Sequence, residues 1–135
     1  MNCSVDLPFF TFPLQGFDGC ETWLEMKIKL FGMLAMLYKN HNYVYDKLDP
    51  YEKTRFSQIR SEDDNCKRMY DALVDLSRHL KTYHGSKCIV LIDEYDHPLD
   101  IAYRYQYYKE ARGFFASLFG AFLKVSIYFG CLRRM

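Results

Sequence analysis

An apolar run that ends abruptly in acids, Cys88-Ile89-Val90-Leu91-Ile92-Asp93-Glu94-Tyr95-Asp96, most constrains how this chain folds. Five consecutive apolar residues are typical of a strand covered on both faces, as in the parallel sheet of an α/β protein. Ligands of such sheets bind beyond the carboxyl ends of the strands, where the three carboxylates of this run would stand. The alternative is a core strand followed by a solvated acidic turn, because turns favour Asp near Pro, as in Asp96-His97-Pro98.

Segments on both sides of this run alternate between strand and helix patterns. Short apolar runs predict two further strands, over residues 8–12 and 125–129. Helical spacing with start and stop signals predicts helices over residues 20–38, 50–59, from a start signal at 61–64 to Tyr83, and 108–122, with a loop over 40–47. Asp49 is the predicted N-cap of the second of these helices, and Gly85 can end the third. We expect an α/β fold, a partial three-layer sandwich with a small, mainly parallel sheet and covering helices.

The extent of the predicted sheet bears on domain organisation. Three strands are few for so many helices, and no helix pattern follows the last predicted strand. The 135 residues are enough for one domain and too few for two. We therefore expect residues 1–135 to be a single incomplete domain.

Composition and charge argue against several classes of function. The formal net charge of +1 gives no electrostatic reason to expect nucleic acid or an anionic membrane as a partner. The five cysteines include no C-x-x-C pair and the four histidines follow no metal-ligand spacing, which argues against a zinc site. No leader pattern opens the chain and no apolar run reaches the length of a membrane span, so we expect a cytoplasmic protein.

Two adjacent acids at the end of a buried strand suit the hydrolysis of a nucleotide. In hydrolases of the P-loop class, this pattern is the Walker B element. Asp93 is then the candidate ligand of Mg²⁺, Glu94 the candidate catalytic residue that polarises a water, and Asp96 a weaker second candidate for the metal. Both acids are needed because holding the metal and positioning the water are separate tasks.

Motifs on both sides of the acidic run carry a resemblance to a known family. After the run they are Pro98, Ala102-Tyr103, Tyr107 to Arg112, Phe114-Phe115, Leu118 to Gly120 and Leu123-Lys124; before it they are Lys47 to Lys53, Arg55-Phe56 and, less closely, Pro8 to Gly19. With these motifs the chain resembles the AAA-ATPase-like proteins, which are domains of the P-loop type, over nearly its whole length. The resemblance implies a P-loop NTPase fold with ATP and Mg²⁺ as cofactors.

The chain departs from the family at the phosphate-binding part of the site. Such domains hold phosphates in a Gly-rich loop, G-x-x-x-x-G-K-[ST] or a close relative, that follows a strand and opens a helix, and nothing here matches it. Gly85-Ser86-Lys87 comes after a helix and before a strand, so it does not qualify. A Thr-Gly pair of the family is replaced by Phe129-Gly130, although Arg133 keeps a plausible sensor position. We expect a fragment with weak or no ATP hydrolysis, which takes ATP and Mg²⁺ only if a phosphate loop is supplied from outside this chain.

Two other functions are compatible with the residues. A non-catalytic interaction module, binding a protein partner or a second copy, would use the aromatic surface around Tyr103, Tyr105, Tyr107 and Tyr108, although a packed helix start explains these residues too. A metal-dependent nuclease is the weaker hypothesis. Glu94-Tyr95-Asp96 lacks the lysine of an E-x-K pattern, and the near-neutral charge offers little to hold DNA.

Overall fold

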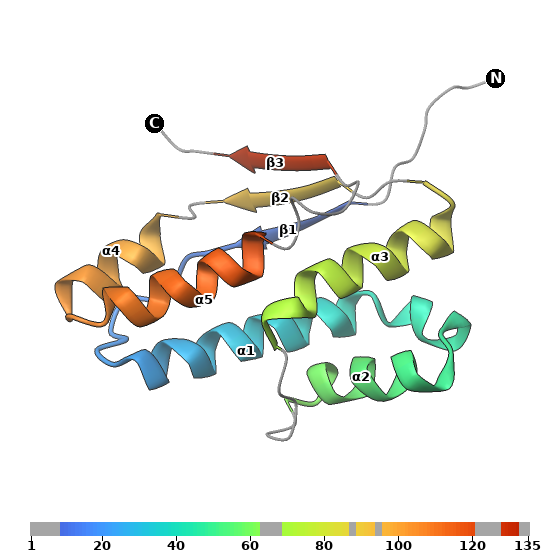
Figure 1. The fold of residues 1–135 in the computed structure, drawn as a ribbon, viewed down its shortest axis with the longest axis horizontal. Coiled ribbons are helices and arrows are strands. Elements are labelled where there is room, and N and C mark those ends of the chain that lie inside the picture. Colours follow the sequence, from blue (N-terminus) through green and yellow to red (C-terminus); the bar gives the residue numbers. More distant parts are fainter. Residues whose placement is uncertain (1–8, 63–68, 87–88, 94–95, 121–127, 133–135) are drawn as a thin grey trace.

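The computed structural model describes residues 9–62, 69–86, 89–93, 96–120 and 128–132 (Figure 1). The strands are β1 (Phe9–Pro13), β2 (Ile89–Asp93) and β3 (Tyr128–Leu132). The helices are α1 (Trp23–Asn40), α2 (Pro50–Arg60), α3 (Ala72–His84), α4 (His97–Arg104) and α5 (Tyr108–Gly120), with short 3-10 helices η1 (Asn42–Lys47) and η2 (Met69–Asp71). Far more of the described residues therefore lie in helices than in strands.

The strands form one sheet in the order β1-β2-β3, and both pairings are parallel. Ile89 at the start of β2 aligns with Phe9 and Tyr128, and Asp93 at its end aligns with Pro13 and Leu132. Because all three strands run the same way, their carboxyl ends meet at one edge of the sheet. We call this edge, formed by Pro13, Asp93 and Leu132, the carboxyl edge.

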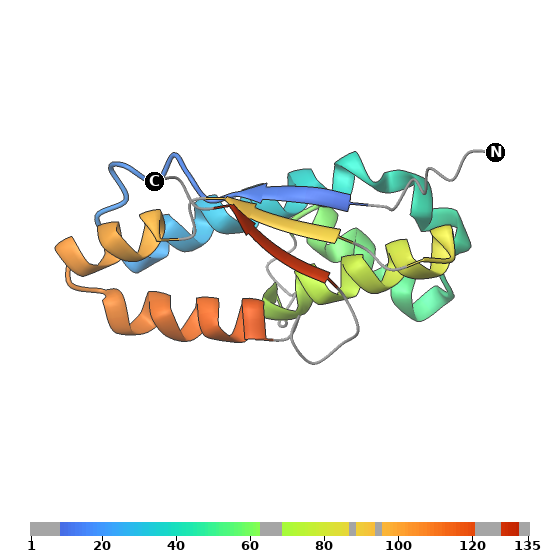
Figure 2. The same cartoon turned by 90° about the horizontal axis from the view of Figure 1, so that it is seen from above.

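All the described helices lie on the same side of this sheet (Figure 1 and Figure 2). The predicted three-layer sandwich is therefore wrong for the described residues, which form a predominantly helical layer against one face of three short strands. The physical reason lies in the connections. The connection from β1 to β2 and the connection from β2 to β3 both move one strand in the same direction across the sheet. Two crossovers of the same hand that move in the same direction place their helices on the same face. Helices on both faces require a reversal in strand order, which periodicity in a sequence does not reveal.

Capping interactions fix where the longer helices begin and end. Thr22 caps α1: its hydroxyl accepts a hydrogen bond from the Glu25 backbone N–H at 3.2 Å, while the Glu25 carboxylate accepts one from the Thr22 N–H at 3.3 Å. This capping box starts the helix at Trp23, three residues after the predicted start. Asp49 caps α2 as predicted, and Gly85, at φ 72°, ends α3 as predicted.

Several element boundaries differ from the sequence predictions. The segment predicted as a loop over 40–47 contains η1, and α4 was not predicted at all. β3 extends to Leu132, beyond the predicted end at 129, while residues 125–127 of the predicted strand lie outside the described residues. α3 begins at Ala72 after η2. Short helices such as α4, with eight residues, carry too few turns for a clear apolar period.

Part of the core lies where α1, α2 and α3 meet, and the same buried cluster extends to Phe12 of β1 and to residues of α4 and α5. Tyr38 and Phe56 are completely buried, and their ring centroids lie 4.7 Å apart. The Tyr38 hydroxyl donates a hydrogen bond to the Ala72 backbone carbonyl, so a side chain of α1 contacts both other helices. The polar tip of a buried tyrosine needs such a partner, because an unpaired hydroxyl in a core is costly.

Candidate functional site

The carboxyl edge of the sheet is the location predicted for the acidic site. Asp93 is the last residue of β2, the central strand, and it is flanked in register by Pro13 of β1 and Leu132 of β3. Its backbone therefore lies in the middle of the edge, as the sequence predicted for the end of a buried strand. Glu94, the predicted catalytic residue, lies outside the described residues.

Asp96 lies at the start of α4, three residues after Asp93. Its backbone carbonyl accepts the N–H of Asp100 at 3.0 Å, which begins the helix. Its side chain is exposed and makes no capping hydrogen bond. Helix formation thus uses the backbone of Asp96 and leaves its carboxylate facing water near the end of β2.

His97, the first residue of α4, joins this helix to the loop after β1, and the sequence did not single it out for a role. The Phe17 backbone N–H donates to Nε2 of His97 at 3.4 Å, and the two rings lie 6.1 Å apart. Because Nε2 accepts this hydrogen bond, the neutral imidazole carries its proton on Nδ1. The contact ties the loop after β1 to the beginning of α4, across 80 residues of chain.

A second hydrogen bond joins the loop after β1 to the start of α5. The hydroxyl of Tyr107 donates to the backbone carbonyl of Cys20 at 2.6 Å, in a buried contact. Burial is the main cause that raises the pKa of Tyr107 to about 12, so the hydroxyl stays protonated and remains a donor. Tyr107 is therefore a buried structural residue, and its inclusion in the predicted aromatic surface is wrong.

The other three tyrosines of that surface are exposed. Tyr103, Tyr105 and Tyr108 expose 65%, 43% and 41% of their surface. The rings of Tyr103 and Tyr108 meet edge to face, with centroids 6.0 Å apart. The surface thus contains three residues, on α4, on α5 and between them.

The described residues contain no cluster of three or more His, Cys, Asp or Glu side chains that could hold a metal ion. The side chain of Asp93 and all of Glu94 fall outside the part searched. Metal binding by Asp93 and Asp96, and catalysis by Glu94, therefore stay predictions.

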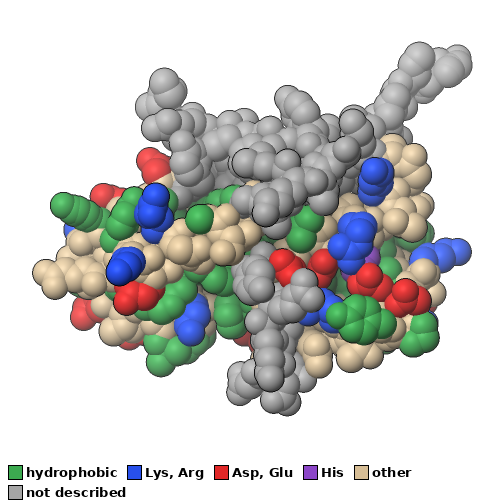
Figure 3. All heavy atoms as spheres, in the orientation of Figure 1, with side chains coloured by type: hydrophobic (Ala, Val, Ile, Leu, Met, Phe, Trp, Pro, Cys, Tyr) green, Lys and Arg blue, Asp and Glu red, His purple; other side chains and the backbone are tan. Residues whose placement is uncertain are grey.

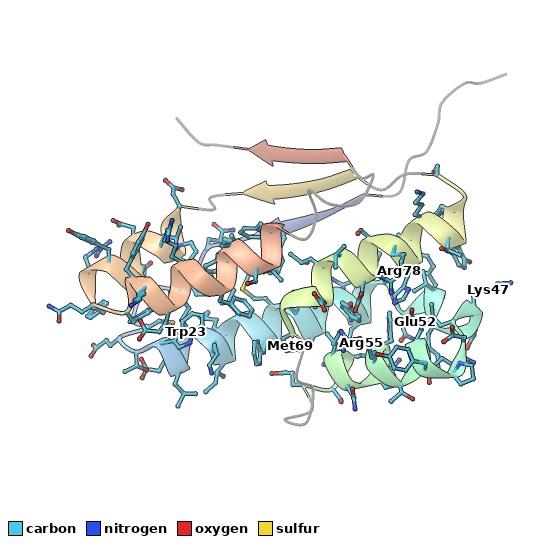
Figure 4. The ribbon with its side chains drawn as sticks, in the orientation of Figure 1. Trp23, Lys47, Glu52, Arg55, Met69 and Arg78 are labelled. Carbon is cyan, nitrogen blue, oxygen red and sulfur yellow. The ribbon has the colours of Figure 1, made fainter. Side chains whose placement is uncertain are left out.

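A second group of charged residues joins α2 to α3, away from the sheet. Figure 3 shows acidic and basic side chains intermixed over this end of the molecule, and Figure 4 shows Glu52, Arg55 and Arg78 between the two helices. Arg55 pairs with Asp75 at 2.8 Å, and Arg78 reaches both Asp75 and Glu52 at 3.0 Å. Arg55 and Asp75 are 20 positions apart in the sequence, and Arg78 and Glu52 are 26 apart, so these two pairings are a consequence of the fold.

His79 is buried beside this network. Its Nε2 lies 3.6 Å from Oε1 of Glu52, and that oxygen is buried without a hydrogen-bond partner among the described residues. Burial lowers the pKa of His79, although the neighbouring Glu52 opposes the shift. The imidazole is therefore held neutral near physiological pH, and the group has a structural role in joining α2 to α3.

Comparison with known families identifies the relationship of the chain. The family model described as AAA-ATPase-like, a predicted AAA-ATPase, matches residues 18–133. The chain belongs to this AAA-ATPase-like family. The family resemblance inferred from the sequence motifs is thus confirmed, and the match includes the acidic run and both helices that follow it.

The comparison with curated proteins finds no match, and the comparison with solved structures finds none either. Within the described part of this AAA-ATPase-like chain, none of the helices has both the length and the apolar character needed to cross a membrane.

We predict that the stability of the chain falls as the pH is lowered from about 7 to about 5, in part through His79. Since folding lowers the pKa of His79, the unfolded chain binds its proton more readily and gains from acidification. Urea unfolding at several pH values should show a shallower pH dependence for His79→Gln than for the wild type. His84→Gln, at an exposed position on the same helix, serves as the control. Equal slopes for His79→Gln and the wild type would contradict the prediction.

Proposed function

We propose that this AAA-ATPase-like chain carries the metal-binding and water-activating half of a nucleotide site, and that ATP is hydrolysed only when a phosphate loop is supplied from outside the chain. The observation that carries the proposal is the position of Asp93 at the end of the central strand, between two parallel neighbours. Ligands of open parallel sheets bind beyond this edge. The family to which the chain belongs supports a nucleotide as the ligand.

Each acid has a distinct role in the proposal. Asp93 holds Mg²⁺, which prefers hard oxygen ligands and keeps several waters when bound by one or two carboxylates. Glu94 accepts a proton from, or orients, the water that attacks the terminal phosphate. Asp96 contributes a second oxygen to the metal or its waters, which is compatible with its exposure at the start of α4.

The acids alone are a poor site for ATP. Phosphoryl transfer depends on donors and cations that hold the β and γ phosphates, whereas carboxylates without a metal repel them. The printed sequence contains no G-x-x-x-x-G-K-[ST] motif. Gly85 of the Gly85-Ser86-Lys87 segment ends α3, and its N–H donates to the Lys81 carbonyl at 2.8 Å, so this amide is committed to the helix.

We predict no saturable ATP binding by this chain in Mg²⁺, and binding with turnover by a longer chain that begins with a strand and a phosphate loop. In the longer chain, Glu94→Gln should retain ATP binding and lose about a hundredfold or more in turnover, since removing a general base typically costs that much. Asp93→Asn should make both ATP binding and turnover less dependent on Mg²⁺. Calorimetry and phosphate release measure the two properties.

The control for these variants is Asp100→Asn. Asp100 is an exposed acid on α4 that pairs with Arg104, and the proposal gives it no part in the site. Tight ATP binding and turnover by the chain alone, lost in Glu94→Gln, would refute the need for an external phosphate loop.

Self-association through the three exposed tyrosines is the second candidate function. The supporting observation is that Tyr103, Tyr105 and Tyr108 expose large aromatic surfaces within one short stretch. This proposal predicts a defined oligomer in sedimentation velocity that the double variant Tyr105→Ala, Tyr108→Ala dissociates. The matched control is Tyr51→Ala, on α2 and also exposed. A monomer at all concentrations, or an oligomer that the double variant leaves intact, would exclude it.

A further inference from the structure

A polar pocket is lined by residues of η1 and α2. These two elements lie at the end of the molecule away from the carboxyl edge (Figure 1). The volume of the pocket is about 350 Å³, within the range of sites for small molecules. The residues that line it are Tyr45, Lys53, Thr54, Ser57, Gln58 and Ser61. None of the six is acidic, and Lys53 is cationic.

The charge of Lys53 is not neutralised by the acid next to it in sequence. Glu52 is directed at α3, where it pairs with Arg78 at 3.0 Å (Figure 4). In the described part of the chain, Lys53 takes part in no ion pair, and its ammonium lies over the ring of Tyr45, 5.4 Å from the centroid. Arg60 lies over the same ring at 4.9 Å. Lys53 therefore brings a positive charge to the lining of the pocket, and Arg60 adds a second one beside the Tyr45 ring.

One hydroxyl of the pocket is set up as a hydrogen-bond donor. Arg60 donates to Oγ of Ser57 at 3.3 Å. A hydroxyl that accepts from a guanidinium keeps its own proton for another acceptor. Lys53 and Ser57, one turn apart on α2, therefore provide donors of the kind that phosphoryl oxygens accept.

Two other hydroxyls of the pocket, those of Thr54 and Ser61, are set up as hydrogen-bond acceptors for a ligand. Thr54 donates to the Pro50 carbonyl at 3.1 Å, and Ser61 donates to the Ser57 carbonyl at 2.8 Å. Because their protons are used within the helix, these oxygens offer lone pairs to a ligand. A phosphate alone, which is mainly an acceptor, would not use them, whereas the hydroxyl groups of a ligand would.

We propose that the pocket between η1 and α2 binds a small phosphorylated molecule that also carries hydroxyl groups, of the class of phosphorylated polyols. Lys53 and Ser57 bind the phosphoryl group, and Thr54 and Ser61 accept from the ligand's hydroxyls. The site is separate from the nucleotide site proposed at the carboxyl edge and shares no residue with it.

The test is a titration of the full chain with glycerol 3-phosphate, inorganic phosphate and glycerol, followed by backbone amide NMR at constant ionic strength in sodium chloride. We expect saturable shifts confined to η1 and α2 for the first two probes, with glycerol 3-phosphate the tighter, and none for glycerol. Lys53→Ala should weaken binding about tenfold or more, since a hydrogen bond to a charged group is lost. Lys53→Arg should retain binding, and Lys109→Ala, an exposed lysine on α5, should leave it unchanged.

Three results would overturn the proposal. The first is the absence of saturable shifts with glycerol 3-phosphate, and the second is undiminished binding in Lys53→Ala when its amide spectrum shows a folded protein. The third is equal affinity for inorganic phosphate and glycerol 3-phosphate, which would remove the role given to Thr54 and Ser61.

Discussion

β2 pairs in parallel with both β1 and β3, and a parallel pair cannot be closed by a tight turn. Each connection must therefore cross the length of the sheet, and here the chain uses helices for it: α1, α2 and α3 between the first two strands, and α4 and α5 between the last two. Both connections step in the same direction, so the helices share one face of the sheet. The same pairing brings three strand ends to one edge, with Asp93 in the middle.

Contacts distant in sequence then hold the loops at that edge. Phe17 and His97 join the loop after β1 to the start of α4, and Tyr107 and Cys20 join that loop to α5. The hydrogen bonds span 80 and 87 positions, so they depend on the tertiary fold and not on local sequence. The edge thus owes its arrangement to the parallel sheet. The pocket beside Lys53 depends instead on contacts between η1 and α2, neighbours in sequence.

Local patterns predicted the parts of this fold that local physics determines. The apolar run at 88–92 indicated β2, and Asp49 and Gly85 marked helix ends because capping involves only residues a few positions apart. The placement of all helices on one face depends on strand order, which no local pattern encodes. Likewise, Tyr107 differs from its exposed neighbours through its contacts with Cys20 and Trp23, and the role of His97 comes from its contact with Phe17. These partners are distant in sequence.

The central claim is that the acidic end of β2 retains the metal-binding half of a nucleotide site. Paramagnetic broadening of amide NMR signals by Mn²⁺, a substitute for Mg²⁺, tests it most directly. The account predicts broadening centred on residues 93–97 that Asp93→Asn abolishes and that the control Asp46→Asn, at an exposed acid on η1, leaves unchanged. Broadening centred elsewhere, or unaffected by Asp93→Asn, would contradict the claim.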